Sequence, residues 1–255
     1  MTKNADYGNR LTIGSIGWKI EPEYNLQFAV FSETDNSLSF YRKDKIPNVG
    51  ETFNDRVVTE VYQDVNKVRA EESADLLTGG SNYGTPWNSR QSQIEKVFVK
   101  DSIAPISTAY WFFMYSLDEI DISKLDTRLT DNMFAMFAGI NAQAMKDNIF
   151  LDVSSLNTSN VKDMGFMFAQ CFAKKIIGLH NFDTSKVTNM NAMFSYGIQR
   201  HLDLSSFTIT ENTNTDNMLY DQLNLETLKT GSKIKFSGKE GLDGDWKDSQ
   251  DNVFR

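Results

Sequence analysis

LDVSSLNTSNVKDMGFMF, at residues 151–168, is followed by IGLHNFDTSKVTNMNAMF at residues 177–194. The two segments share one pattern, in which Phe168 and Phe194 are 26 residues apart, as are Met164 and Met190. A fixed period of this size is typical of proteins built from stacked repeats. The stretch therefore predicts a solenoid.

Each repeat begins with a short strand pattern. Leu151 and Val153 alternate with Asp152 and Ser154, so the apolar pair is expected to face a core and the polar pair to face out. The next residues, 157–160, are Asn, Thr, Ser and Asn, whose side chains hydrogen-bond nearby backbone groups and turn the chain. A corner is expected after the strand.

The second half of the repeat predicts one or two helical turns. Met164, Met167 and Phe168 stand at i, i+3 and i+4, which places three large apolar groups on one helical face. One repeat cannot bury that face alone, so neighbouring copies must stack with their strands in parallel. We therefore expect an α/β solenoid of short parallel strands and short helices.

Weaker copies of the pattern flank the quoted stretch. Residues 120–127 lead to Met133, Met136 and Phe137, and a strand pattern returns at residues 202–207. The first of these copies carries an insertion at residues 139–148, which we expect to bulge from the helical side. The pattern decays after residue 207, as it does in the capping repeat of a solenoid.

Three regions follow from these patterns. Residues 1–100 are β-rich and non-repetitive, with alternating runs at 26–31 and 38–41, and we expect them to cap the open end of the solenoid. Within this region, residues 1–17 are a candidate attachment arm. Residues 101–222 form the predicted repeat solenoid and residues 223–255 a predicted C-terminal cap.

Bulk properties exclude several functions. The net charge of −8 argues against general nucleic-acid binding, because phosphate backbones attract clusters of Lys and Arg. The single cysteine, Cys171, allows no internal disulfide and is expected to be a buried small hydrophobe. No secretion signal is visible in this sequence, and no apolar run is long enough to span a bilayer.

The sequence holds no recognisable catalytic motif. The Gly-rich segment 79–84 lacks the Lys-Ser/Thr ending of a phosphate loop, and residues 243–248 lack ligands that a calcium loop requires. His180 is expected at an outward strand position and His201 at a strand edge, without a Cys or Ser partner. We therefore expect a non-enzyme with no cofactor and no metal.

The outward side of the predicted strands is the remaining candidate site. Its polar residues form a narrow acidic and hydroxyl-rich row, which we call the strand-face ribbon. The ribbon consists of Asp121, Ser123, Asp152, Ser154, His180, Asp203 and Ser205. Solenoids bind partners on such faces, but solvated strand positions would show the same residues.

The block LDVSSLNTSNVKDMGFMFAQC, with its echo NFDTSKVTNMNAMF, resembles the BspA-like leucine-rich repeat family of bacterial surface proteins, also described as a domain of unknown function with Met-Phe repeats. The resemblance extends to SLSFYRKDKIPNVGETFNDRVVTEVY, PWNSRQSQIEKVFVKDSIAPISTAYWF and the closing LKTGSKIKFSGKEGLDGDWKD. The closing segment is similar to the end module of such proteins in Gram-positive bacteria and their phages. The resemblance implies a leucine-rich-repeat-like stack and adhesion.

Three functional hypotheses remain open, two of them non-catalytic. The third, an enzyme, would require a clustered, desolvated acid or base in a pocket. The first is a non-catalytic adhesion protein, displayed on a bacterial cell surface, that binds a protein or glycan through a solenoid face. The second is a phage virion structural protein, a head decoration or tail-associated component, docked to neighbouring virion proteins by its N-terminal region. The two non-catalytic hypotheses place the chain outside the cell or on a virion surface, and neither involves nucleic acid or a membrane span.

Overall fold

The computed structural model describes residues 9–13, 18–22, 26–69, 84–140, 150–242, 246–247 and 253–254. Two hairpins are described by their backbone alone, namely β1 (Asn9–Ile13) with β2 (Trp18–Pro22) and β14 (Trp246–Lys247) with β15 (Val253–Phe254). The candidate arm, the Gly-rich segment, the insertion and the calcium-like loop lie wholly or mainly outside the described residues.

A five-stranded sheet begins the well-described part of the chain. Its order is β7-β3-β4-β8-β9, with β4 and β8 in parallel and β3 antiparallel to both β4 and β7. The strands are β3 (Leu26–Ser32), β4 (Ser37–Lys43), β7 (Glu60–Gln63), β8 (Lys96–Val99) and β9 (Glu119–Asp121). The two alternating runs at residues 26–31 and 38–41 lie in β3 and β4, which pair antiparallel with each other. A small hairpin, β5 (Thr52–Phe53) with β6 (Arg56–Val57), precedes β7.

The five-stranded sheet shares an aromatic core with the first turn of the solenoid that follows it. We call each turn of the solenoid a coil. Phe40 of β4 stacks on Trp111 with ring centroids 5.2 Å apart, and Trp87 packs edge-on against both rings. The Trp87 indole N–H donates to the Trp111 carbonyl at 3.0 Å, so this buried polar atom is satisfied. Because β4 also pairs with β8, the first edge of the solenoid is covered by β-structure.

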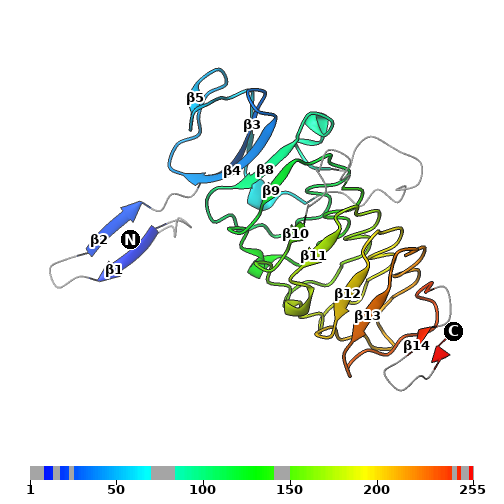
Figure 1. The fold of residues 1–255 in the computed structure, drawn as a ribbon. Coiled ribbons are helices and arrows are strands. Elements are labelled where there is room, and N and C mark those ends of the chain that lie inside the picture. The colour runs from blue at the N-terminus through cyan, green and yellow to red at the C-terminus, as the bar shows by residue number, and fades with distance from the viewer. Residues whose placement is uncertain are drawn as a thin grey trace.

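The rest of the chain is a β-solenoid of about five turns (Figure 1). One side carries the parallel pairs β8–β9, β10–β11 and β12–β13. The strands not yet bounded are β10 (Phe150–Asp152), β11 (Lys175–Ile177), β12 (His201–Leu204) and β13 (Thr227–Thr230). The solenoid prediction is confirmed.

The predicted α/β character is wrong, and the leucine-rich-repeat-like stack of strands and helices is not supported. The described residues contain no α-helix, and their only helical pieces are single 3₁₀ turns. These turns are η1 (Val65–Lys67), η2 (Asn88–Arg90), η3 (Thr127–Leu129) and η4 (Leu179–Asn181). None of them coincides with the Met-Phe segments, which run as successive turns.

Backbone geometry explains why the Met-Phe segments are not helical. Phe166 lies between Met164 and Met167 with φ +57°, and its equivalents Ala135 and Ala192 are also left-handed, which ends a right-handed helix. Alternate backbone N–H groups of these segments donate to carbonyl groups of the next coil, as when Met164 N donates to Asn189 O at 2.9 Å. The segments thus form rungs of a second ladder.

The distance between successive coils explains why both sides of the solenoid are built from β-type ladders. Parallel strands stack about 4.8 Å apart, whereas an α-helix with its side chains is about 10 Å wide. Helices on one side would therefore force the stack to curve. Here both sides repeat at similar spacing, and the rings of Phe137, Phe168 and Phe194 stack with centroids 5.6 and 5.4 Å apart.

The predicted core is confirmed even though its backbone differs. The side chains of Met164, Met167, Phe168, Met190, Met193 and Phe194 are all fully buried. In a chain of turns, as in a helix, residues at i, i+3 and i+4 reach the same side. The i, i+3, i+4 spacing therefore predicted the buried residues correctly, but the helix predicted from it was wrong.

A column of asparagine and aspartate residues opens the turn side of each coil. Asn132, Asp163, Asn189 and Asn214 form consecutive parallel bridges that begin at Ser107. In each, the side-chain oxygen accepts the N–H two residues ahead, for example from Gly165 to Asp163 Oδ1 at 2.8 Å. These side chains set the corner at which each coil changes direction.

A second column consists of buried threonines. The hydroxyl of Thr158 donates to the Asp183 carbonyl at 3.0 Å and accepts the Asp183 N–H at 2.8 Å. Thr127 and Thr184 make the same pair of bonds to Asn157 and Thr208. Each hydroxyl therefore replaces one missing rung of backbone pairing between coils.

Thr158→Val should lower the free energy of unfolding by about 2 kcal/mol, because it keeps the side-chain shape and leaves two backbone groups unpaired. Chemical denaturation measures the loss. The control is Thr188→Val, since Thr188 is exposed and its hydroxyl makes one long bond of 3.3 Å. Equal effects of the two changes would contradict the role of the buried column.

Glu240 closes the last coil. Its carboxylate accepts the Thr215 hydroxyl at 2.6 Å and the N–H groups of Ser237 and Gly238 at 2.7 and 2.8 Å. Burial works against its ionisation, but the hydrogen bonds from Thr215 and Ser237 outweigh burial and hold the pKa of Glu240 below its usual value of 4.5. The ionised group therefore stabilises the folded chain.

Glu240→Gln should cost about 1.5–3 kcal/mol near neutral pH, the range for hydrogen bonds to a charged group. Because the folded-state pKa is lowered, this contribution is present above about pH 4.5 and is lost as the pH falls through the folded-state pKa. Denaturation from pH 7 to pH 3 should show the two proteins converging in acid. A difference that is constant over this range would contradict the assignment.

Candidate functional site

The strand-face ribbon is a row of turn caps. Asp121 Oδ1 accepts the N–H of Ser123 at 3.0 Å, and Asp152 Oδ1 accepts that of Ser154 at 2.9 Å. These residues are exposed, as expected, but each carboxylate uses one oxygen to hold its own turn. The recurrence of Asp in the repeats therefore has a structural cause.

The third aspartate of the ribbon is neutralised by a lysine. Asp203 Oδ1 accepts both the N–H and the hydroxyl of Ser205, and Asp203 Oδ2 lies 2.9 Å from Lys229 Nζ. Burial works against ionisation of Asp203, but the bonds from Ser205 and Lys229 outweigh it and lower the pKa to about 2. Both oxygens of the Asp203 carboxylate are therefore already bonded within the chain, which disfavours ligand binding there.

The structure does not bring the whole ribbon into one continuous column. Asp152 stands opposite Ile177, so an apolar residue separates it from Asp203 in the next coil. Gly178, with φ +100°, is an extra residue before η4, and β11 consequently does not pair with β12 among the described strands. His180 lies exposed on η4, past this break.

The other groups singled out in the sequence do not assemble a reactive centre. Cys171 is fully buried, and burial raises the pKa of its thiol to about 11, which keeps it protonated at neutral pH. His201 lies exposed on β12 with its Nδ1 atom 2.7 Å from the Thr227 hydroxyl. Among the described residues, no three His, Cys, Asp or Glu side chains gather as metal ligands would.

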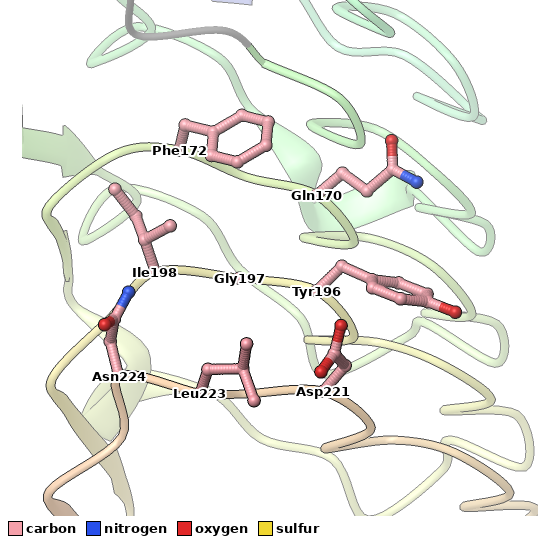
Figure 2. Close-up of a pocket in the computed structure, with 8 residues that line it drawn as sticks. All are labelled: Gln170, Phe172, Tyr196, Gly197, Ile198, Asp221, Leu223 and Asn224. Atoms are coloured by element: carbon pink, nitrogen blue, oxygen red, sulfur yellow. The ribbon is translucent and has the colours of Figure 1, made fainter.

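Sequence reasoning missed a groove on the turn side of the solenoid. Its volume is about 340 Å³, and it crosses three successive coils (Figure 2). We call it the rim groove. It is lined by Gln170, Phe172, Tyr196, Gly197, Ile198, Asp221, Leu223 and Asn224.

Left-handed residues set one side of the rim groove. Gln170, Tyr196 and Asp221 occupy the same place in three coils, with φ values of 52°, 57° and 57°. In Figure 2 they lie on one side of the groove, with Phe172, Ile198 and Asn224 on the other. The polar Gln170 and Asp221, with the amphipathic Tyr196 between them, thus face a mainly apolar row.

Two buried glutamines support the floor. Gln199 Nε2 donates to the carbonyls of Cys171 and Ala173 at 2.8 and 2.7 Å, and Gln222 Nε2 donates to the Phe194 carbonyl. A Cβ on Gly197 would stand 2.4 Å or less from both amide groups, so a side chain at this position would displace the two glutamines. The floor is therefore fixed by bonds between coils.

Large apolar side chains are exposed along the groove. The exposed fraction is 81% for Leu223, 46% for Tyr196 and 38% for Phe172. Tyr196 also packs edge-on against Tyr220, with ring centroids 5.3 Å apart. Exposed apolar residues that adjoin one another mark binding surfaces more reliably than scattered ones.

The sequence did carry a signal for this groove. Phe172, Ile198 and Leu223 each follow the stacked Phe or Leu of their coil by four residues, a spacing that a helix would have buried. In the turns they point outward instead. Apolar residues that recur at a non-core position are the pattern that would have identified the site.

The comparisons with known proteins bear on the same region. A family model described as a Mycoplasma protein of unknown function, DUF285, matches residues 140–232. This match includes the quoted repeats and every residue of the rim groove. No curated protein and no solved structure matches the chain. Within its described residues, the structure has no helix with the length and apolarity needed to cross a bilayer.

Proposed function

We propose that this protein is a non-catalytic binding protein that acts at a bacterial cell surface and holds its ligand in the rim groove. The observation that carries the proposal is the exposure of Leu223, Tyr196 and Phe172 along a groove whose floor is fixed. A soluble chain gains nothing in folding from apolar groups left in water, so a partner is expected to cover them.

The strand face is the less favourable place for a ligand. Its carboxylates already hold the N–H groups of Ser123, Ser154 and Ser205, and Asp203 is paired with Lys229. A ligand there would have to compete with these bonds. In the rim groove, by contrast, burying exposed apolar area contributes directly to affinity.

The resemblance to BspA-like surface proteins supports the same class of function. That family is associated with adhesion, and the DUF285 match falls on the coils that form the groove. The proposal is therefore an adhesion-type interaction rather than a reaction. The ligand would be a molecule displayed on a host or bacterial surface.

The test is binding of the labelled chain to a panel of bacterial and animal cells. Tyr196→Asn combined with Leu223→Ser should lower the amount bound at least about tenfold, the loss expected for central apolar anchors. Asparagine is chosen because it tolerates the left-handed backbone at this position. Both side chains are exposed, so folding should be preserved.

Two matched variants complete the test. Leu129→Ser removes another exposed leucine, which lies on η3 away from the groove, and should bind as the unchanged protein does. Asp152→Asn with Ser154→Ala alters the strand face and should also bind normally. Loss of binding in the strand-face variant, with the groove variant unaffected, would overturn the proposal.

A further inference from the structure

We infer that the ligand of the rim groove is an uncharged oligosaccharide. This inference rests on the proposed binding function and specifies its ligand class. The supporting observations are the shape of the groove, the pairing of its backbone, the mixture of its side chains and its charge.

The shape favours an extended ligand. The groove is open and runs across three coils, from Gln170 and Phe172 to Asp221 and Asn224 (Figure 2). A compact molecule would need an enclosed pocket to bury most of its surface. A chain of linked rings can instead lie along the solenoid and contact each coil in turn.

Backbone pairing disfavours an extended peptide. Peptides that add to a β-structure bind through unpaired N–H and carbonyl groups. On the side of the groove formed by Gln170 and Tyr196, backbone N–H groups are used between coils, since Gln170 N donates to Ser195 O and Tyr196 N to Tyr220 O, both at 2.8 Å. An added peptide strand would not find these two N–H groups free, which favours a ligand recognised mainly by side chains.

The side chains match the two surfaces of a sugar ring. A pyranose has an apolar C–H face and a rim of hydroxyl groups, so it needs apolar surface and hydrogen-bonding groups together. Phe172, Tyr196 and Leu223 supply the first, and Gln170 and Asn224 are among the groups that supply the second. Side-chain amides can donate to one hydroxyl and accept from another.

The charge of the lining residues favours neutral sugars over acidic ones. Asp221 is the one carboxylate among the eight lining residues, and none of the eight is a Lys, Arg or His. An acidic sugar would face this carboxylate without a counter-charge. Neutral hexoses and N-acetylhexosamines fit the groove, whereas sialylated and sulfated sugars do not.

The experiment probes an array of immobilised neutral oligosaccharides, made of hexose and N-acetylhexosamine, together with their sialylated and sulfated counterparts. The full chain should bind neutral members and not their acidic counterparts. Tyr196→Asn should weaken this binding at least about tenfold, and Leu129→Ser should leave it unchanged. Asp221→Asn should reduce the discrimination against sialylated members.

Binding to no neutral oligosaccharide, or binding that Tyr196→Asn leaves intact, would overturn the inference. Cell binding separates this failure from failure of the proposed function. Periodate cleaves the vicinal diols of sugars, so it should abolish cell binding, whereas protease treatment alone should not. Binding that resists periodate and is lost to protease would exclude the oligosaccharide but retain a surface-binding function.

Discussion

Phe168→Ala should lower the free energy of unfolding by about 3–5 kcal/mol, the usual cost of truncating a buried aromatic residue. Phe168 is fully buried, and its ring stacks between those of Phe137 and Phe194 at 5.6 and 5.4 Å. The substitution would remove the middle ring of a column and leave a cavity between coils. Chemical denaturation and thermal melting both measure the loss.

The control is Phe172→Ala, in the same coil. Phe172 is exposed on the rim groove, and its removal should change stability by no more than about 0.5 kcal/mol. An unchanged melting temperature for Phe168→Ala would mean that the stacked register of the repeats is wrong.

Gly178→Ala is expected to lower the free energy of unfolding by about 2–5 kcal/mol, the sum of left-handed backbone strain and overpacking. Gly178 has φ +100°, where a residue with a Cβ is strained, and that Cβ would lie 2.5 Å from the Ser154 backbone in the preceding coil. The added methyl group must therefore push two coils apart. Overpacking of this kind adds about 1–3 kcal/mol to the backbone strain.

Gly50→Ala separates the two contributions. Gly50 also has a left-handed backbone, with φ +83°, but a Cβ there would meet no atom within 4 Å. This variant should lose only the conformational term, about 1–2 kcal/mol. If Gly178→Ala were no worse than Gly50→Ala, the close approach of η4 to the preceding coil would be incorrect.

The sequence was sufficient to predict the solenoid and its core. Leu151 and Val153 alternate as a half-buried strand does, and the repeat of Phe168 at Phe194 fixes which residues stack. Both inferences use the side-chain pattern alone. The predicted solenoid and core therefore do not depend on whether helices or turns connect the buried residues.

The conformation of the Met-Phe segments could not be read in the same way. A period of i, i+3 and i+4 is shared by a helix and by a chain of tight turns, and Phe166 gives no hint of its positive φ, as a glycine would. The preference for turns comes from neighbouring coils, which take up alternate N–H groups. That is a tertiary effect, invisible in one repeat.

The strand-face ribbon could be identified from the sequence, whereas the rim groove was missed, because the groove depends on the conformation of the turns. Asp121, Asp152 and Asp203 drew attention because they recur, yet they recur as caps for the turns that follow. The rim groove arises because the left-handed turns carry Leu223 and Tyr196 outward. Neither residue belongs to the Met-Phe pattern from which the buried face was predicted.

Photo-crosslinking tests the location of the ligand site most directly. A benzophenone-bearing amino acid would replace Leu223 in the rim groove or Ser154 on the strand face, both exposed positions, and the chain would be irradiated on the cells that bind it. We predict a covalent adduct with surface material from position 223 and none from position 154. An adduct formed from position 154 alone would contradict the account.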